Sequence, residues 1–383
     1  MLSSSWIELD ASAVAKNIRY LKKRIAPAQF VSVIKGNAYG HGIEQFVPLA
    51  ERAGVSCFAV YDAREAHTAL QVKSEHSRLI IMGMLDEDQL EWIIGKGVEF
   101  YVFTPQRLAA AVEVAKKLKR KALVHLELET GMHRTGIEEV EFPEVVDLIR
   151  KNRRHLCLKG ICTHYAGAES VANFLRIQNQ YQAFLRLKKE LKKAGIVAEA
   201  YHSACSAAAL IYPHTIMDMV RFGIAQYGFW PSMETKMNNL LSPQVKFTRD
   251  PLKTVLSWKT HVMSVKAVAK GNFINYGNSF LSTKPMKLAT IPVGYHQGYA
   301  KNLSHSGLVL LRGKRAPVVG SINMNMFMVD VSHIHTVVPG DEVVLIGKQG
   351  ELSISVASFA ELTKTMNYEL LARLPQQIPR VAN

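Results

Sequence analysis

The sequence has few of the features that mark secreted, membrane or metal-binding proteins. No apolar run reaches the roughly 18 residues of a membrane-spanning helix, and the start lacks the basic segment and long apolar stretch of a secretory signal. The four cysteines, Cys57, Cys157, Cys162 and Cys205, are too few for a disulfide framework and show no paired metal-ligand spacing. These absences predict a cytoplasmic protein with reduced cysteines, no membrane segment and no bound metal.

A dinucleotide-binding motif is also incomplete, because no third glycine follows Gly40 and Gly42 at the required spacing. The formal net charge of +15 is compatible with a nucleic-acid partner. The basic runs at 116–121 and 186–193, however, are interrupted by leucines at helical spacing, which is typical of a solvated helix face. We therefore expect no nucleic-acid partner.

The 383 residues are enough for two domains, since single hydrophobic cores seldom exceed about 250 to 300 residues. In the first part of the chain, short apolar segments alternate with helical patterns, as in repeated βα units. The apolar segments are 30–34, 57–61, 79–84, 100–104, 123–127, 158–163, 200–202 and 219–221. These eight expected parallel strands predict a closed (β/α)8 barrel, the TIM barrel.

The rest of the chain is rich in Val, Ile, Thr and Gly with frequent turns, which predicts a mainly antiparallel β domain. Strands are expected at 258–268, 287–292, 316–320, 326–331 and 342–346, with a final helix from near Ser355. We place the barrel at 1–240 and the β domain at 241–383, joined by a polar linker at 236–246 beside Pro243. The first ten or so residues are candidates for the β domain.

The barrel assignment also predicts where the chemistry occurs, because TIM-barrel enzymes build their sites at the carboxyl ends of the strands. Several polar and basic residues follow predicted strands. They are Lys35, Arg134, His164, Ser206, Arg221 and Gly223. Residues far apart in the sequence would therefore converge on one barrel mouth.

Lys35 ends the first of these strands, in a segment that reads V-S-V-I-K-G-N-A-Y-G-H-G over residues 31–42. A lysine amine that is desolvated at the end of a buried strand has a lowered pKa and can form a Schiff base with a carbonyl compound. A simpler interpretation is a basic residue that only ends a strand. The pattern of strand, lysine and glycine does not by itself separate the two.

The other candidates also have two interpretations each. Ser206 precedes a helix-forming run, so it either caps that helix or helps bind an anion together with Gly223 and Ile224. Arg221 is either an ion-pair partner or a hydrogen-bond donor that never loses its proton. His164, taken alone, is equally compatible with a structural role.

Four segments together resemble the alanine racemases, the pyridoxal phosphate enzymes with a barrel fold, and the resemblance extends over nearly the whole chain. They are the Lys35 run, L-E-T-G-M-H-R-T-G at 128–136, V-R-F-G-I-A-Q-Y-G at 220–228 and I-N-Y-G-N-S-F at 274–280. The resemblance implies an isomerase that interconverts L- and D-alanine, a peptidoglycan precursor. It also implies pyridoxal 5'-phosphate on Lys35 and a homodimer in which Lys35 and Tyr276 of the partner subunit are the two bases.

The resemblance assigns further roles residue by residue. Arg134 would contact the substrate carboxylate and the cofactor, and the Met324 amide would contact the same carboxylate. His164 would link Arg221, which faces the ring nitrogen, to the catalytic tyrosine. The remaining cofactor-binding residues would be Tyr39, Ser206, Gly223, Ile224 and Tyr368. Glu127 stands where most relatives carry a carbamylated lysine, and we expect it to hydrogen bond to Arg134 without modification.

The chain departs from the family pattern at several positions. Its own residues there are Cys205, His296, Gln297, Ser321, Asn323 and Asn325. Most of these lie near the expected substrate entrance, so a racemase for serine, lysine or a broad set of amino acids stays open. A decarboxylase, an aldolase or a noncatalytic cofactor-binding protein is the other class. Tyr276 argues against a mere carrier, and Arg221 argues against a decarboxylase.

Overall fold

The computed structural model describes residues 3–241, 250–363 and 366–383. The chain divides into two compact units. The barrel unit comprises Ser12–Lys35 and Val47–Thr254, and the β unit comprises Met1–Ala11, Gly36–Phe46 and Val255–Asn383. The chain thus leaves the barrel unit directly after Lys35, enters the β unit for one short segment, and then returns.

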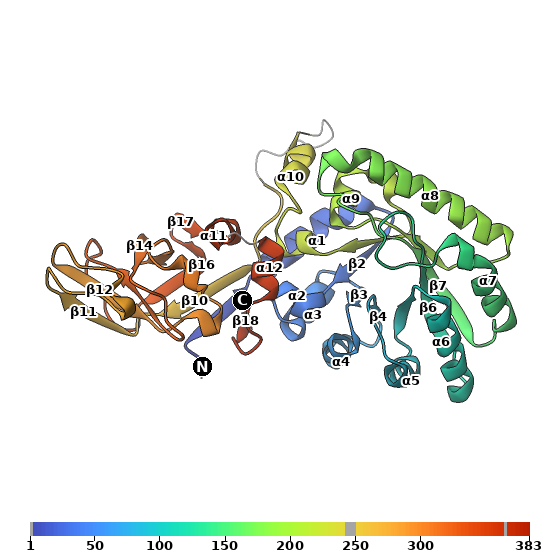
Figure 1. Ribbon diagram of the computed structural model, residues 1–383, viewed down its shortest axis with the longest axis horizontal. Helices are drawn as coiled ribbons and strands as arrows, with labels where there is room; N and C mark the ends of the chain where they lie inside the picture. Colours follow the sequence, from blue (N-terminus) through green and yellow to red (C-terminus); the bar gives the residue numbers. More distant parts are fainter. Residues whose placement is uncertain (1–2, 242–249, 364–365) are drawn as a thin grey trace. The chain divides into compact units, whose positions relative to one another are not determined.

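The barrel unit contains eight parallel strands, which confirms the predicted fold (Figure 1). They are β2 (Gln29–Val33), β3 (Cys57–Val60), β4 (Arg78–Ile81), β5 (Glu99–Val102), β6 (Ala122–Glu127), β7 (Leu156–Cys162), β8 (Ala200–His202) and β9 (Met219–Phe222). The order is β8-β7-β6-β5-β4-β3-β2-β9, and a bridge between Cys205 and Arg221 links the two ends of this sheet. The barrel is therefore nearly closed.

Helices cover the outside of this barrel, as Figure 1 shows for α4 to α8. The helices of this part of the chain are α1 (Ala11–Ile25), α3 (Ile43–Arg52), α4 (Ala63–Val72), α5 (Glu87–Lys96), α6 (Pro105–Leu118), α7 (Phe142–Lys151), α8 (Phe174–Lys193), α9 (Ser206–Ile211) and α10 (Met233–Leu240). The sequence explains α6 locally. The Thr104 hydroxyl accepts a hydrogen bond from the Arg107 amide, Pro105 occupies the first turn, and Leu108 is among the buried residues.

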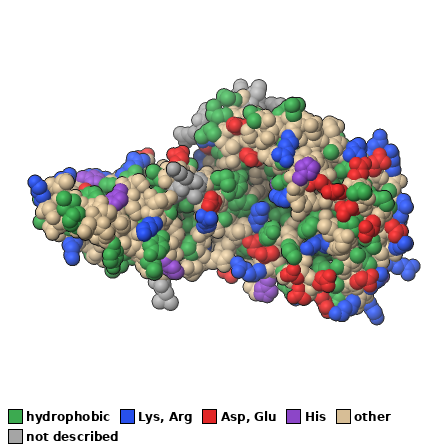
Figure 2. Space-filling model, viewed as in Figure 1, with side chains coloured by type: hydrophobic (Ala, Val, Ile, Leu, Met, Phe, Trp, Pro, Cys, Tyr) green, Lys and Arg blue, Asp and Glu red, His purple; other side chains and the backbone are tan. Residues whose placement is uncertain are grey.

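The basic runs lie on helices, as the leucine spacing predicts. In α8 the buried residues include Phe184, Leu187 and Leu191, whereas Arg186 and Lys193 are exposed and pair with Glu139 and Glu190. Figure 2 shows basic and acidic side chains interspersed over the visible face of the barrel unit. On that face the positive charge forms no continuous basic surface.

The β unit is built on a mainly antiparallel sheet, which confirms the second predicted architecture. Its strands are β1 (Ser5–Leu9), β10 (Leu256–His261), β11 (Ser264–Val268), β12 (Met286–Ile291), β13 (Leu308–Leu311), β14 (Lys314–Val319), β15 (Phe327–Asp330), β16 (Glu342–Gln349), β17 (Leu352–Ile354) and β18 (Arg380–Ala382). Two helices lie between β17 and β18 in the sequence, α11 (Val356–Thr363) and α12 (Asn367–Ala372). Strand β1 pairs with β10 and β18, so the start of the chain lies in this sheet.

One predicted strand, at 258–268, is wrong in its extent, because the structure divides it into β10 and β11. Strand β10 pairs with β1 and β16, whereas β11 pairs with β12. The change occurs at Val262 and Met263, whose amides donate to the carbonyls of Asp341 and Thr290. An apolar sequence pattern does not record such an exchange of partners.

The predicted linker coincides only partly with the described residues. Residues 236–240 belong to α10, whereas 242–249, including Pro243, lie outside the described ranges. The domain limits at 240 and 241 therefore stay predictions.

A left-handed turn follows Lys35 and belongs to the β unit. Gly36, Asn37, Ala38 and Tyr39 all have φ between 51° and 62°. This conformation costs roughly 1–2 kcal/mol for each residue with a side chain, so other contacts must hold it. Arg380 supplies two of them, since its Nε and Nη2 donate to the Gly40 carbonyl at 3.2 and 3.0 Å.

His41 completes this turn from the inside. It is fully buried, and its Nδ1 lies 3.0 and 2.9 Å from the carbonyl oxygens of Ala38 and Tyr39. Carbonyl oxygens only accept, so Nδ1 carries the hydrogen. Burial lowers the pKa of His41 from 6.5 to about 4.

We expect His41 to make the β unit sensitive to acid. In the unfolded chain His41 takes up a proton near pH 6.5, whereas in the folded chain it stays neutral down to about pH 4. The stability that is present above pH 6.5 is therefore lost as the pH falls from 6.5 to about 4. The loss amounts to roughly 3 kcal/mol. Thermal unfolding of His41→Gln should therefore depend less on pH in this window than that of the unmodified protein. His335→Gln, at an exposed histidine, is the control. Equal slopes for all three proteins would contradict this prediction.

Candidate active site

Lys35 is the second residue after β2, at the carboxyl end of the barrel strands. Lys35 is exposed overall, although the surrounding protein crowds and partly desolvates its amine. This crowding lowers the pKa of the Lys35 amine, and the positive charges of Arg134 and Arg221 lower it further, while Glu65 acts in the opposite direction. An amine with a lowered pKa is suited to attack a carbonyl group and to accept a proton.

Arg221, on β9, is a buried guanidinium that ties together the ends of three strands. Its Nη1 donates to His202 Nδ1 at 2.6 Å and to the His202 carbonyl at 3.2 Å. Its Nη2 donates to the carbonyls of Thr163 and Ser203 at 2.8 and 2.9 Å. Within the described part of the chain, no hydrogen bond of Arg221 uses Nε. One N–H of a permanently charged group thus stays available to a ligand.

His164 lies beside Arg221, with its Nδ1 3.4 Å from Nη2 of the arginine. Burial and the neighbouring charges of Arg221, Arg134 and Lys35 lower the pKa of His164 to about 3. The imidazole is therefore neutral at physiological pH. Its role as a link toward a tyrosine stays a prediction.

The two segments predicted to bind phosphate lie next to each other. The Gly223 amide donates to the Ser206 hydroxyl oxygen at 3.0 Å, and both groups are buried. Ser206 begins α9, and Ile224 begins the short turn Ile224–Tyr227. The Ser206 hydroxyl keeps its own hydrogen for a further acceptor, so this corner fits an anionic group such as a phosphate.

Glu127 is buried at the end of β6, but its hydrogen bond differs from the one we expected. Its Oε2 accepts from the Thr135 hydroxyl at 2.9 Å, and among the described residues it has no hydrogen bond to Arg134. Burial raises the pKa of Glu127, and Thr135 and Arg134 partly oppose this rise. The family resemblance pointed to the loop opposite Glu127 but not to Thr135, the neighbour of Arg134, as the hydrogen-bond partner of the carboxylate.

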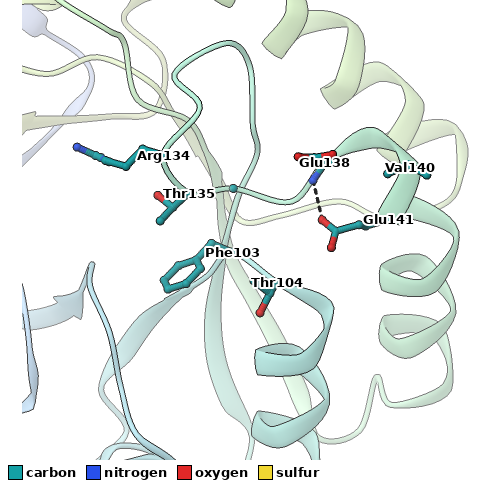
Figure 3. Close-up of a pocket in the computed structure, with 8 residues that line it drawn as sticks. Phe103, Thr104, Arg134, Thr135, Glu138, Val140 and Glu141 are labelled. Carbon is teal, nitrogen blue, oxygen red and sulfur yellow. Dashed lines mark hydrogen bonds between the residues drawn. The ribbon is translucent and has the colours of Figure 1, made fainter.

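A pocket of about 530 Å³ lies beside this loop, on the side of the barrel where β5 and β6 end. Its lining residues are Phe103, Thr104, Arg134, Thr135, Gly136, Glu138, Val140 and Glu141. Figure 3 shows that the Arg134 side chain extends away from Glu138 and Glu141. The Glu141 carboxylate instead accepts a hydrogen bond from the Glu138 amide at 2.8 Å. The Arg134 guanidinium is thus not neutralised by the acidic residues of this pocket.

In the β unit, Tyr276 begins a short turn (Tyr276–Asn278) and is 76% exposed. The preceding Asn275 has a φ of 67° and is held by two residues that depart from the family pattern. Its Nδ2 donates to the Ser321 carbonyl at 2.6 Å, and its Oδ1 accepts from Asn323 Nδ2 at 2.8 Å. The Asn323 side chain and the backbone at Ser321 therefore help to hold the tyrosine segment.

Other departures lie in the same part of the β unit. The His296 amide donates to the Met324 carbonyl at 3.0 Å, and Gln297 Oε1 accepts from the Gly294 amide at 3.0 Å. Met324 is 55% exposed. Tyr39 and Tyr368, predicted to bind the cofactor, also lie together, with ring centroids 6.0 Å apart.

The sequence analysis missed His202, the closest side-chain partner of Arg221, and His125 behind it. Both are buried within barrel strands. A histidine inside a short apolar strand was the available signal, because a buried imidazole needs a hydrogen-bonding partner.

In the three described ranges, no group of three or more His, Cys, Asp or Glu residues could hold a metal ion. None of the described helices is long and apolar enough to cross a membrane.

Comparisons with known proteins cover both units. The family model for the N-terminal domain of alanine racemase matches residues 9–231, and that for the C-terminal domain matches residues 255–382. An alanine racemase of Leptospira interrogans is 32% identical over 382 residues, which cover 99% of this chain and 95% of the relative.

Solved structures agree with these matches. The crystal structure of alanine racemase from Bacillus anthracis with bound L-Ala-P has a TM-score of 0.89 at 30% identity, and the match covers 100% of this chain and 96% of that one. Alanine racemase from Bartonella henselae with covalently bound pyridoxal phosphate has the same fold, with a TM-score of 0.83 at 24% identity over 100% of both chains. The chain belongs to the alanine racemase family of isomerases.

Proposed function

We propose that this protein interconverts L- and D-alanine with pyridoxal 5'-phosphate as its cofactor. The observation that carries the proposal is the Lys35 amine, whose pKa is lowered at the barrel mouth near the guanidinium groups of Arg134 and Arg221. When bound, pyridoxal phosphate supplies an aldehyde that condenses with amines and a ring that stabilises negative charge at the α-carbon. The relatives named as alanine racemases support the choice of substrate.

Lys35 would have two roles in turnover. It would hold the cofactor covalently in the resting protein, and its amine, once released by the incoming amino acid, would take or return the α-proton on one face. The lowered pKa keeps a larger fraction of this amine neutral near pH 7, which is the form that accepts a proton.

Arg221 would limit the reaction to racemisation. A guanidinium donates a hydrogen bond to the cofactor ring nitrogen but does not give up its proton. The free Nε–H suits this contact, because Nη1 and Nη2 are occupied. A ring nitrogen that stays unprotonated would stabilise less negative charge, so the contact with Arg221 would favour return of the proton to the α-carbon over transamination.

The second base would be Tyr276 of the partner subunit. Racemisation requires an acid–base group on each face of the α-carbon. The exposure of Tyr276 supports a position where another subunit could cover it. The proposal therefore includes a homodimer whose sites combine residues of both chains. A cytoplasmic location also stays a prediction.

The remaining residues would orient the ligands. Arg134 and the Met324 amide would bind the substrate carboxylate, with Glu127 as a supporting negative charge. Ser206, Gly223 and Ile224 would receive the phosphate together with Tyr39 and Tyr368. The pairing of Ser206 with Gly223 supports this arrangement.

A racemase for a different amino acid is the second candidate, favoured by Asn323, a departure from the family pattern whose side chain holds Asn275. Ser321 and Asn323 contact this residue directly, next to Tyr276. A panel of single-enantiomer amino acids in deuterated water, followed for configuration and α-deuterium, distinguishes the candidates. Racemisation of serine or lysine without alanine would retain the mechanism and change the substrate. Release of carbon dioxide without racemisation would rule out both racemase candidates.

Replacing Lys35 by alanine should abolish covalent cofactor attachment and lower racemisation by at least about 100-fold, the scale of a lost acid–base group. Borohydride reduction followed by peptide mapping measures the attachment independently of turnover. Lys266→Ala, at an exposed lysine of β11, is the matched control and should behave like the unmodified protein. Covalent cofactor that persists in Lys35→Ala would rule out the role given to Lys35.

Mixed dimers test whether two chains share each site. Lys35→Ala and Tyr276→Phe homodimers should both be nearly inactive. When the two variants are unfolded and refolded together in equal amounts, half of the dimers are mixed, and each mixed dimer regains one site with both bases. We expect recovery of about a quarter of the unmodified activity, as symmetric pairing requires. No recovery from confirmed mixed dimers would place both bases on one chain.

A further inference from the structure

A hydrogen-bonded chain of buried side chains crosses the interior of the barrel unit. Arg221 Nη1 lies 2.6 Å from His202 Nδ1, His202 Nε2 lies 2.9 Å from His125 Nδ1, and His125 Nε2 lies 2.8 Å from Glu99 Oε2. Glu99 in turn accepts from Nε and Nη2 of Arg78, both at 2.7 Å. We call these five residues the interior relay.

The interior relay runs from one end of the barrel to the other. Arg78 and Glu99 are the first residues of β4 and β5, at the amino ends of the strands. His125 lies within β6, His202 ends β8, and Arg221 lies near the end of β9. The side chain of Arg78 is 34% exposed, whereas that of Glu99 is 5% exposed. An ion pair at the foot of the barrel is thus connected to the guanidinium at its mouth.

Arg221 fixes the direction of every hydrogen bond in the relay. A guanidinium only donates, so His202 Nδ1 must accept, and the single proton of a neutral His202 must sit on Nε2. That proton is donated to His125 Nδ1, so the proton of His125 must also be on Nε2, where it is donated to Glu99. Any other arrangement of two neutral imidazoles would set two donors or two acceptors against each other.

The electrostatics of the relay agree with this assignment. Burial lowers the pKa of both His125 and His202 from the ordinary value of 6.5, which favours the neutral imidazoles at physiological pH. Burial alone would raise the pKa of Glu99, but hydrogen bonds from His125 and Arg78 outweigh it and bring the pKa to about 2. Two neutral imidazoles therefore connect a buried carboxylate to a buried guanidinium.

The adjacent strand leaves room for this arrangement. A Cβ atom at Gly160, on β7, would lie 2.1 Å from His125 Nδ1. The backbone at Gly160 lies outside the left-handed region, so its conformation does not require glycine. The ring of Tyr101 packs against His125 and His202, with centroid distances of 5.8 and 6.0 Å. Because Gly160 has no side chain, the His125 ring has the space it needs to take part in the relay.

We propose that Arg78, Glu99 and His125 are positioning residues for Arg221 and act through His202. The Arg78 ion pair orients the Glu99 carboxylate, Glu99 orients His125, and His125 orients His202. The lone pair on His202 Nδ1 then fixes the Nη1 edge of the guanidinium. With this edge fixed, Nε faces the ligand in one orientation. The consequence for catalysis rests on the proposed function, whereas the arrangement of the side chains does not.

Nitrogen NMR of the full-length, cofactor-loaded protein labelled at histidine and arginine tests the arrangement. We expect His125 and His202 each to have one protonated ring nitrogen, Nε2, and one unprotonated nitrogen, Nδ1. Glu99→Gln removes the charge, and Gly160→Ala displaces His125 without changing any ionisable group. Both variants should shift the ring signals of His202, whose ring nitrogens are hydrogen bonded to Arg221 and His125. Both should also speed hydrogen exchange at the Arg221 side chain by about tenfold or more.

Kinetics test the consequence for the reaction. Both variants should lower kcat for racemisation by about tenfold with little change in KM, the scale on which partners that orient a functional group contribute. Transamination per turnover should rise, because the guanidinium no longer holds the ring nitrogen in one contact. Gly95→Ala is the matched control, since an added Cβ there meets no atom within 4 Å. It should leave the spectra and the kinetics unchanged.

Three outcomes would overturn the proposal. The first is a proton on Nδ1 of His125 or His202 in the unmodified protein. The second is unchanged His202 and Arg221 signals in a folded Glu99→Gln protein, which stays informative even if Gly160→Ala does not fold. The third is altered signals with unchanged kcat and transamination. An unmodified protein that racemises no amino acid would refute the proposed function instead, while the NMR result would still decide whether the relay exists.

Discussion

The buried guanidinium of Arg221 is the interaction on which the barrel mouth depends. Carbonyl oxygens at the ends of β7 and β8 converge on it, and one charged group supplies hydrogen-bond donors to these buried acceptors. The same charge helps to lower the pKa of Lys35 and of His164. Burial is the larger cause of both shifts, and the charge of Arg221 adds to it at the same place where its hydrogen bonds join the strand ends.

A second constraint lies just after Lys35, where the chain passes from the barrel unit to the β unit. Consecutive left-handed residues there are held by Arg380 and by the buried His41. This strain is local, and its cost is met by hydrogen bonds within the β unit. The lysine is therefore followed by a backbone of defined, left-handed geometry.

The repeated βα pattern predicted all eight barrel strands, because alternation of apolar strands with amphipathic helices is a local property of the sequence. It failed at 258–268, where the backbone changes partners between Val262 and Met263. The motifs also drew attention to Glu127 and its loop, but the hydrogen bond formed with Thr135. His125 and His202 were missed because they are 77 residues apart in the sequence, and because Arg221, the other partner of His202, lies on another strand.

The sequence by itself determined the barrel, the mainly antiparallel β domain and the position of Lys35 after a strand, because these follow from periodicity and residue type. The tertiary structure alone decided which side chains meet: Arg221 with His202, Glu99 with His125 and Arg78, and Ser206 with Gly223. Hydrogen bonds are directional and extend over only about 3 Å. The direction of a side chain within a closed barrel therefore settles them, and neighbouring residues in the sequence carry no record of it.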